Sequence, residues 1–314
     1  MKKIKKKTIL VIGGTGFIGY HLIKKCIKMK WSVTSISTTK PKKFRKLKKV
    51  NYLICDVSKK NLLNKKLNNN IYNYVVNLSG YVDHSDKSQT FKSHYIGCKN
   101  LADFFTDKEI SSFVQIGSSS EYGRVGSPQK EESSCKPLTI YGKSKFLATK
   151  YLNQLYKKNK FPFTVLRIYQ AYGPKQDFNR FIPIVIKACI KNKLFPCSHG
   201  KQYRDFTYVD DIINAIIFSL KSYKSKGKII NIGTGRPKQI KAIIKKIREK
   251  LRGGKPQFGL VKLRKDEILS IYPNLRNAKN LINWSSKVTL DEGLNKTMKF
   301  YLKELKKREY LQLK

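Results

Sequence analysis

The chain has 314 residues, and its 40% hydrophobic share is ordinary for a globular protein and excludes extended disorder. Its 67 Lys and Arg residues against 20 Asp and Glu give a net charge of +47, spread along the whole length. That even spread favours a compositional bias, followed by attraction of anionic substrates, and no zinc-finger spacing or RNA-binding motif supports a specific nucleic-acid site.

The six cysteines are scattered without CxxC pairing, which indicates neither a metal site nor a disulfide framework. We expect buried free thiols in a reducing compartment. The only apolar run near the basic N-terminus, Ile9 to Ile12, is too short for a signal segment or a membrane span. We therefore expect a cytoplasmic protein with no membrane segment and no metal.

Short apolar, β-branched runs recur along the first half of the chain and are separated by helix-compatible stretches. The predicted strands are Thr8 to Ile12, Ser32 to Ser37, Tyr52 to Cys55, Tyr74 to Leu78, Ser112 to Ile116 and Phe163 to Ile168. Predicted helices cover residues 20–29 and 141–155. This alternation predicts an α/β fold with a Rossmann-type, doubly wound parallel sheet.

The second half is less regular. Residues 171–204 are rich in Gly and Pro around one predicted helix at 182–192, followed by a helix at 210–220 and a strand at 228–232. A terminal helix is expected at 290–305. We predict a dinucleotide-binding domain over residues 1–170, to which 205–235 return. Residues 171–204 and 236–314 would form a smaller substrate-binding domain.

A glycine-rich segment, GGTGFIG, joins the first predicted strand to the first predicted helix. In this context Gly13 allows a tight turn, Gly16 lets backbone N–H groups approach a diphosphate, and Gly19 lets the helix pack closely. The N-terminus of the helix that follows adds a positive field, and Phe17 and Ile18 are further cofactor contacts that we expect. The segment predicts dinucleotide binding.

The end of the second predicted strand carries no carboxylate that would bind ribose hydroxyls. Ser37 stands there, eighteen residues after Gly19, and Lys40 follows, with Lys42, Lys43 and Arg45 close behind. Hydroxyls and cations suit a 2′-phosphate, so NADP is favoured over NAD. The general abundance of lysine weakens this inference, and NAD remains the alternative.

Tyr141 precedes Lys145 by four residues, and on a helix the two side chains share a face. A lysine ammonium beside a phenol lowers the pKa of the phenol toward working pH, which suits an acid/base catalyst. Alone, the pair also fits a solvated helical face. The glycine-rich segment and the serines at 118–120 favour the catalytic interpretation.

Several motifs occur together between residues 8 and 300: GGTGFIG, CDV (55–57), GSSSEYG (117–123), YGKSK (141–145), YGP (172–174), RDF (204–206), YVDD (208–211), NIGTG (231–235) and NW (283–284). In this order the chain resembles the extended short-chain dehydrogenase/reductase family of NAD-dependent nucleotide-sugar epimerases, dehydratases and reductases. The combination is specific for the family and much less specific for the reaction.

The resemblance implies roles for individual residues. Tyr141 would exchange a proton with the sugar hydroxyl, Lys145 would assist it and bind the nicotinamide ribose, and Ser118 would orient the hydroxyl, with Ser119 as its alternative. Asp56 would meet the adenine. Val57 and Leu78, each at the end of a predicted strand, are further cofactor contacts that we expect.

On the substrate side, the resemblance implies that Arg204 and Arg264 contact the diphosphate of a sugar nucleotide. Ser119 and Gln170 are further candidates, although relatives often carry Asn where Gln170 stands. The alternative for Arg204 is a buried side chain paired with Asp205. The segment 166–211 is most similar to enzymes acting on CDP-linked or related deoxysugars, some of them NADPH-dependent 4-keto reductases.

Two departures from the family pattern bear on the reaction. Ser119 and Ser120 replace the Asp-Glu pair of dehydratases, and Glu121 is expected to point away, so water elimination is disfavoured. His94 replaces a usual Asn, either as a titrating group or as a core histidine.

We therefore expect an epimerase or 4-keto reductase that transfers a hydride at a sugar carbon, C4, of a nucleotide-diphosphate hexose. It would act as a homodimer in the synthesis of cell-surface polysaccharides. The rival is a non-catalytic dinucleotide- or RNA-binding protein.

Overall fold

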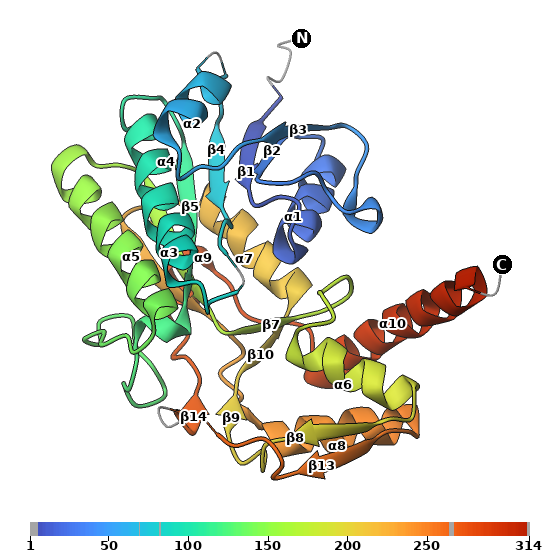
Figure 1. Ribbon diagram of the computed structural model, residues 1–314. Coiled ribbons are helices and arrows are strands. Elements are labelled where there is room, and N and C mark those ends of the chain that lie inside the picture. The colour runs from blue at the N-terminus through green and yellow to red at the C-terminus, as the bar shows by residue number, and fades with distance from the viewer. Residues whose placement is uncertain (1–5, 69, 82, 264–266, 313–314) are drawn as a thin grey trace.

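A parallel sheet of seven strands forms the centre of the computed structural model, which describes residues 6–68, 70–81, 83–263 and 267–312. The strand order is β11-β6-β5-β4-β1-β2-β3, and every neighbouring pair is parallel (Figure 1). The strands are β1 (Thr8–Ile12), β2 (Ser32–Ser37), β3 (Val50–Ile54), β4 (Tyr74–Asn77), β5 (Ser112–Ser118), β6 (Phe163–Ile168) and β11 (Lys228–Ile232).

The central strands are buried on both faces, which is why they are almost continuously apolar. In β1, Ile9 and Val11 belong to one core layer, while Leu10 and Ile12 belong to the other. Successive side chains of a strand point to opposite faces, so one five-residue run serves both layers.

Helices cover both faces of the sheet (Figure 1). The first core layer is completed by α1 (Phe17–Lys28) and α7 (Val209–Lys221). The second is completed by α2 (Lys60–Leu67), α4 (Gly97–Thr106) and α5 (Ile140–Asn159). A short helix, α3 (Lys87–Phe91), runs through a π-helical turn, Lys92–Ile96, into α4. The doubly wound parallel sheet predicted from the sequence is thus confirmed.

The remaining elements form a smaller unit on one side of the sheet (Figure 1). It contains α6 (Phe181–Ile190), α8 (Ile240–Leu251) and α10 (Leu290–Gln312), with β8 (Leu194–Cys197) paired to β13 (Lys255–Phe258). A separate small sheet joins β12 (Lys238–Gln239), β9 (Tyr203–Arg204) and β14 (Ser270–Ile271). The exact division of the chain into two domains stays a prediction.

Two further strands connect the sheet to the smaller unit. β7 (Gln170–Tyr172) directly follows β6 and pairs in parallel with β10 (Phe206–Tyr208), which leads into α7. Helix α9 (Arg276–Ile282) contacts β11. The sequence did not predict β7–β10 or β12–β14, because strands of two to four residues are too short to show a hydrophobic period.

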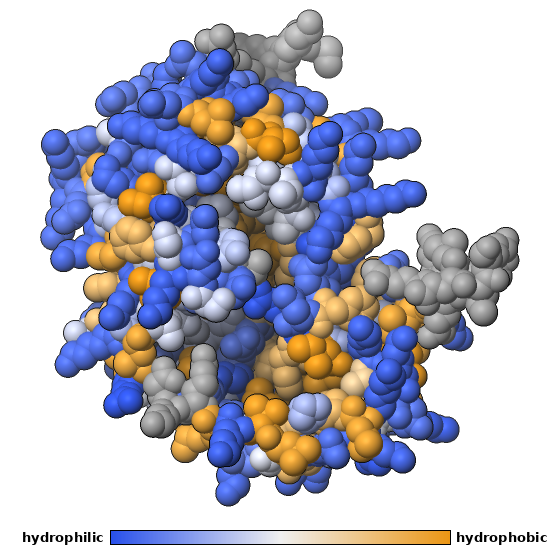
Figure 2. Space-filling view, in the orientation of Figure 1, coloured by the Kyte–Doolittle hydropathy of each residue, from blue (hydrophilic) through white to orange (hydrophobic). Residues whose placement is uncertain are grey.

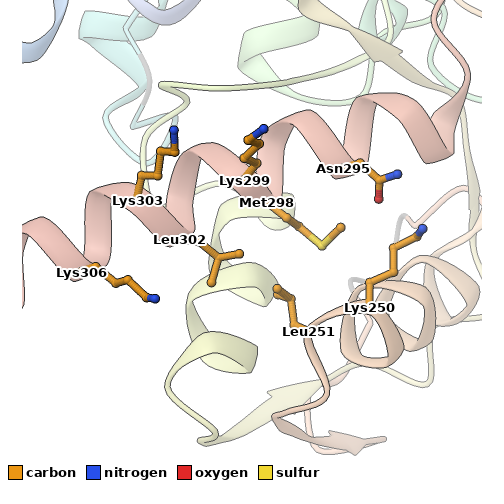
Figure 3. Close-up of a pocket in the computed structure, with 8 residues that line it drawn as sticks. All are labelled: Lys250, Leu251, Asn295, Met298, Lys299, Leu302, Lys303 and Lys306. Carbon is orange, nitrogen blue, oxygen red and sulfur yellow. The ribbon is translucent and has the colours of Figure 1, made fainter.

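Hydrophilic side chains dominate the face shown in Figure 2, while apolar ones gather at its lower part, over the smaller unit. Exposed large apolar residues of this unit include Leu194, Leu260 and Leu269. Helices α8 and α10 also border a surface groove of about 480 Å³ with an apolar floor and a lysine rim (Figure 3). None of the predicted site residues lines it. Among the described residues, no helix has the length and apolarity needed to cross a membrane.

Candidate active site

The predicted cofactor residues lie at one edge of the parallel sheet, where its strands end. Gly13, directly after β1, donates its backbone N–H to the carbonyl of Ile36 in β2 at 2.7 Å. Leu78, directly after β4, donates to the carbonyl of Ile12 at 3.0 Å. Carboxyl ends of adjacent parallel strands are where doubly wound sheets bind nucleotides.

The glycine loop has the geometry that a dinucleotide requires. Gly13 has a φ of +76°, and a Cβ on Gly19 would lie 2.3 Å from the Gly13 carbonyl oxygen. A Cβ on Gly16 would meet only that same oxygen, at 3.2 Å, so its other side is open. No side chain caps the N-terminus of α1, which leaves its first N–H groups available to a diphosphate. The residues fit a nicotinamide dinucleotide.

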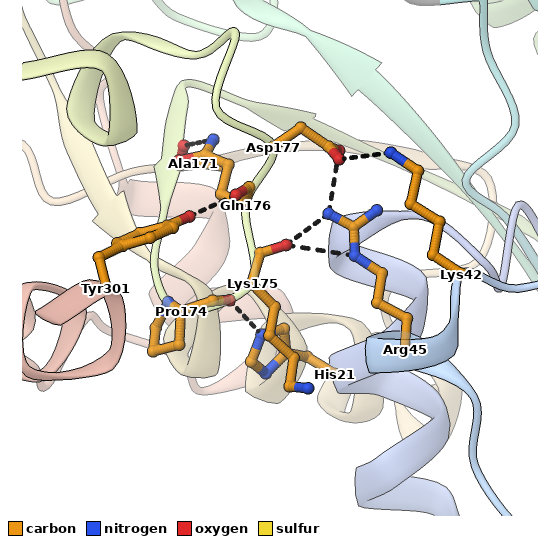
Figure 4. Close-up of polar contacts among 9 residues, drawn as sticks. All are labelled: His21, Lys42, Arg45, Ala171, Pro174, Lys175, Gln176, Asp177 and Tyr301. Carbon is orange, nitrogen blue, oxygen red and sulfur yellow. Dashed lines mark hydrogen bonds and ion pairs between the residues drawn. The ribbon is translucent and has the colours of Figure 1, made fainter. Parts of the chain in front are cut away.

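At the end of β2, fewer residues support binding of NADP than the sequence suggested. The Ser37 hydroxyl faces the glycine loop, accepting from the Thr15 N–H at 3.4 Å, and Lys40 is exposed. Lys42 and Arg45, however, both pair with Asp177, at 3.1 and 2.9 Å (Figure 4). Arg45 is buried and therefore committed to this pair, whereas Lys42 is largely exposed.

Asp56 and Val57 follow β3 and are held by local contacts. The Asp56 carboxylate accepts from the Ser58 N–H at 2.9 Å and from the Ser58 hydroxyl at 2.8 Å. Val57 is buried, and its carbonyl accepts from the Asn100 amide at 3.0 Å. These contacts fix the turn that follows β3, and the cofactor role of the two residues stays a prediction.

Helix α5 brings Tyr141 and Lys145 beneath the end of β5. The helix begins after Thr139, whose hydroxyl accepts from the Gly142 N–H at 3.1 Å. The Lys145 ammonium is buried and donates to the carbonyl of Ile116 at 2.7 Å. Desolvation lowers the pKa of Lys145 to about 8.

The pKa of Tyr141 moves in the opposite direction from the one predicted. Desolvation of the half-buried phenol raises it, while the Ser118 hydroxyl and Arg180 oppose that shift. The Lys145 ammonium donates its hydrogen bond to the backbone carbonyl of Ile116. The sequence argument used spacing alone and could not include burial.

Ser118 ends β5 and caps the short 3₁₀ turn Ser119–Glu121. Its hydroxyl accepts from the Ser120 N–H at 3.2 Å, and Glu121 accepts from the Ser118 N–H at 2.8 Å. The Glu121 carboxylate is fully buried and pairs with Arg167 at 2.9 Å. Its oxygens are engaged by the Ser118 N–H, the Thr149 hydroxyl and Arg167. Arg167 itself was missed, because a single Arg in an apolar strand carries no motif.

His94 is a buried core histidine. It is 4% exposed, and desolvation together with nearby Lys145 lowers its pKa to about 2, which excludes titration near neutral pH. A second histidine that the sequence analysis did not select, His84, stacks on the Tyr141 ring. No sequence signal identified it, because it lies in a loop between β4 and α3.

On the substrate side, Arg204 is buried and forms an ion pair with Glu267. It also donates to the Tyr203 carbonyl at 2.7 Å. The alternative pairing with Asp205 is wrong, because that carboxylate accepts from the backbone N–H groups of Thr234 and Gly235, both at 2.7–3.0 Å.

Gln170, exposed at the start of β7, donates its backbone N–H to the Asp205 carbonyl at 2.9 Å. Ser119 is half-buried in the turn after β5. Arg264 lies outside the described residues. Within the part of the chain that the structure describes, no group of three or more His, Cys, Asp or Glu residues could hold a metal ion.

The parallel sheet and the glycine loop at the end of β1 define a Rossmann-type fold. The model of the NAD dependent epimerase/dehydratase family matches residues 9–233. The chain belongs to that family.

Curated and solved relatives extend the likeness over nearly the whole chain. A putative UDP-glucose 4-epimerase of Methanocaldococcus jannaschii is 27% identical over 303 residues, covering 92% of this chain and 97% of that protein. The UDP-glucose 4-epimerase of Thermotoga maritima, solved with UDP-glucose, superposes with a TM-score of 0.90 at 23% identity and covers 95% and 99% of the two chains.

The UDP-glucuronic acid 4-epimerase of Bacillus cereus, solved with UDP-glucuronic acid and NAD, has a TM-score of 0.84 at 24% identity, with coverage of 95% and 99%. At these identities the solved structures establish the fold of this chain, and its reaction has to be argued from its own residues.

Proposed function

We propose that the protein is an NAD(P)-dependent nucleotide-sugar epimerase or 4-keto reductase, which transfers a hydride at a sugar carbon, C4, of a nucleotide-diphosphate hexose. The observation that carries this proposal is the convergence of three side chains at the end of β5. Ser118 ends the strand, Tyr141 interacts with the Ser118 hydroxyl, and Lys145 bonds to the carbonyl of Ile116 two residues earlier.

In this proposal the Tyr141 phenol exchanges the proton of the sugar hydroxyl, and the Ser118 hydroxyl orients the same oxygen. Lys145 is the group placed to bind the nicotinamide ribose. The bound nicotinamide supplies the hydride acceptor or donor. The glycine loop and the N-terminus of α1 bind the diphosphate of the cofactor. The residues after β3 and β4 lie beside the cofactor where it crosses the end of the sheet, and these are Asp56, Val57 and Leu78.

Elimination of water is the less favoured reaction. A 4,6-dehydratase needs an acid and a base beside the sugar, and Ser119 and Ser120 occupy the two positions after Ser118. The nearby carboxylate, Glu121, accepts hydrogen bonds from Thr149 and Arg167 at 2.8 and 3.0 Å and is fully buried. These buried partners already engage its oxygens, which argues against a role in water elimination.

For the cofactor we propose NADP as the favoured form, with NAD as the alternative. Ser37 and Lys40 support a 2′-phosphate, because the first supplies a hydroxyl and the second a nearby cation at a strand end without a carboxylate. The NAD bound by the Bacillus cereus relative supports the alternative.

For the substrate we propose a nucleotide-diphosphate sugar, bound by Arg204, Gln170 and Ser119. A buried guanidinium at the start of the smaller unit suits a diphosphate, since planar donors bind phosphate oxygens in pairs. A homodimer working in the synthesis of cell-surface polysaccharides remains part of the proposal. Light scattering at several protein concentrations tests the dimer.

The proposal is tested by mass spectrometry of the cofactor that copurifies with the protein, followed by turnover of a panel of UDP-, CDP-, ADP- and dTDP-sugars and their 4-keto forms. Retained NAD⁺ with interconversion of two sugars identifies an epimerase. NADPH consumption on a 4-keto sugar identifies a reductase.

The rival, a dinucleotide- or RNA-binding protein without catalysis, makes the opposite prediction. It requires no turnover on any sugar of the panel, together with RNA binding that falls steeply as salt is raised. That pair of results would overturn the enzymatic proposal.

A further inference from the structure

Two histidines flank the proposed catalytic tyrosine. The imidazole of His84 lies face to face with the Tyr141 ring, with centroids 4.2 Å apart and planes inclined by 13°. His94 meets the same ring edge-on, at 4.9 Å and 76°. The Tyr141 phenol is therefore held from two directions by aromatic side chains, one of them exposed and one buried.

The chain holds these imidazoles in place through contacts between the loop after β4 and the π-helical turn. The Tyr81 N–H donates to the Ser93 hydroxyl at 2.9 Å. His94 Nε2 lies 3.2 Å from the Tyr81 carbonyl and so carries the proton, because a carbonyl can only accept. Further along, Asp86 caps α3 by accepting from the Gln89 N–H at 2.9 Å. The loop that carries His84 is thus fixed at both ends.

The surroundings of both imidazoles lower their pKa values. Burial is the main cause that lowers the pKa of each, and Lys145 adds to it in both cases. Around His84, Arg180 lowers the pKa further, while the Tyr81 carbonyl and Asp83 oppose that shift. Around Tyr141 the charged groups are Glu121 and Arg180. The observed contact of both histidines with Tyr141 is ring against ring, which bears on the orientation of the phenol.

We propose that His84 is a positioning residue for Tyr141: by stacking on the ring it keeps the phenol hydroxyl directed to Ser118, with His94 as the fixed second wall. This inference rests on the proposed function, because it assigns Tyr141 the proton transfer. An aromatic pair of this geometry contributes enough to change a reaction rate by up to about ten-fold when it orients the reacting group.

The test compares three substitutions at His84 on the first sugar nucleotide found to be turned over. His84→Ala and His84→Gln remove the ring, and each is expected to lower kcat roughly ten-fold with KM for the sugar nucleotide nearly unchanged. His84→Phe keeps the stack without the nitrogens and is expected to restore most of kcat. Tyr223→Ala, which removes another exposed ring remote from the site, serves as the control.

Wild-type kcat in His84→Ala would overturn the proposal. So would activity in His84→Gln together with loss in His84→Phe, because that pattern assigns the effect to a hydrogen bond.

A second measurement does not depend on any substrate. Incorporating ¹³Cζ-tyrosine, and assigning Tyr141 by its loss in Tyr141→Phe, allows the phenol to be titrated by NMR. Removal of the covering ring exposes the phenol to water, so the pKa of Tyr141 is expected to fall toward its ordinary value in His84→Ala and to stay raised in His84→Phe.

An unchanged titration in His84→Ala would show that the stack does not cover Tyr141. If the wild-type protein turns over no sugar nucleotide, the proposed function fails, and this titration still decides whether His84 covers the phenol.

Discussion

The glycine loop and Arg204, the two places where we propose phosphate contacts, are assembled in different ways. The loop uses backbone N–H groups of a few contiguous residues between β1 and α1. Gly13, Gly16 and Gly19 lie close to backbone atoms only. Arg204 is a buried charge whose ion-pair partner, Glu267, is 63 positions away in the chain.

This difference in assembly predicts which kind of substitution disrupts each site. A backbone site is specified locally and is lost when a side chain fills the space for the ligand. A buried charged group requires a partner from elsewhere in the fold, because an uncompensated charge in the interior is costly. The pair Glu121–Arg167, beneath Ser118, belongs to this second kind.

The largest expected effect is on the local site. Gly16→Val places a side chain in the open space beside the loop, so we expect no measurable binding of NADH or NADPH in titration calorimetry. The fold should persist, judged by circular dichroism, because only one backbone oxygen is close to the new Cβ. Gly126→Val, at a site with open space around it, is the matched control. Unchanged affinity in Gly16→Val would remove the loop from the cofactor site.

Breaking the buried ion pair Glu121–Arg167 tests how strongly a buried charge depends on its partner. Glu121→Gln leaves Arg167 as an uncompensated buried charge and should lower the free energy of unfolding by about 3–5 kcal/mol, measured by urea denaturation. Glu132→Gln, exposed in the following loop, should change it very little. Replacing both partners, Glu121→Leu with Arg167→Met, should recover most of the loss. A single variant as stable as the wild type would contradict the importance of the pair.

Tyr141→Phe tests whether the convergence at β5 is catalytic. The variant keeps the ring between His84 and His94 but lacks the hydroxyl, so turnover should fall roughly 10²-fold or more while the cofactor still binds. Tyr151→Phe, on the same helix with its hydroxyl bonded to Asp103, should retain activity. Comparable kcat values in the two variants would exclude Tyr141 as the acid/base.

The smallest effect concerns the cofactor choice at the end of β2. We expect NADPH to bind about ten-fold more tightly than NADH, and Ser37→Asp to reverse this order, because a carboxylate repels the 2′-phosphate and accepts from ribose hydroxyls. Ser32→Asp adds the same charge at the other end of the strand and should leave the preference intact. Equal affinities in the wild type at physiological salt would favour tightly bound NAD⁺ and an epimerase.

The sequence by itself determined the parallel sheet, the glycine loop and the placement of Ser118, Tyr141 and Lys145. Each of these depends on a short-range pattern: a buried strand, a strand–glycine–helix junction, and a four-residue spacing on one helix. The family follows from the order of such patterns along the chain.

Only the tertiary structure decided which charged residues pair, how the pKa of Tyr141 shifts and which ring stacks on it. It paired Arg45 with Asp177 and Arg204 with Glu267, raised the pKa of Tyr141, and stacked His84 on its ring. These features depend on burial and on contacts between residues far apart in the chain, and desolvation and Coulomb interactions are set by distances in space that no spacing along the sequence encodes.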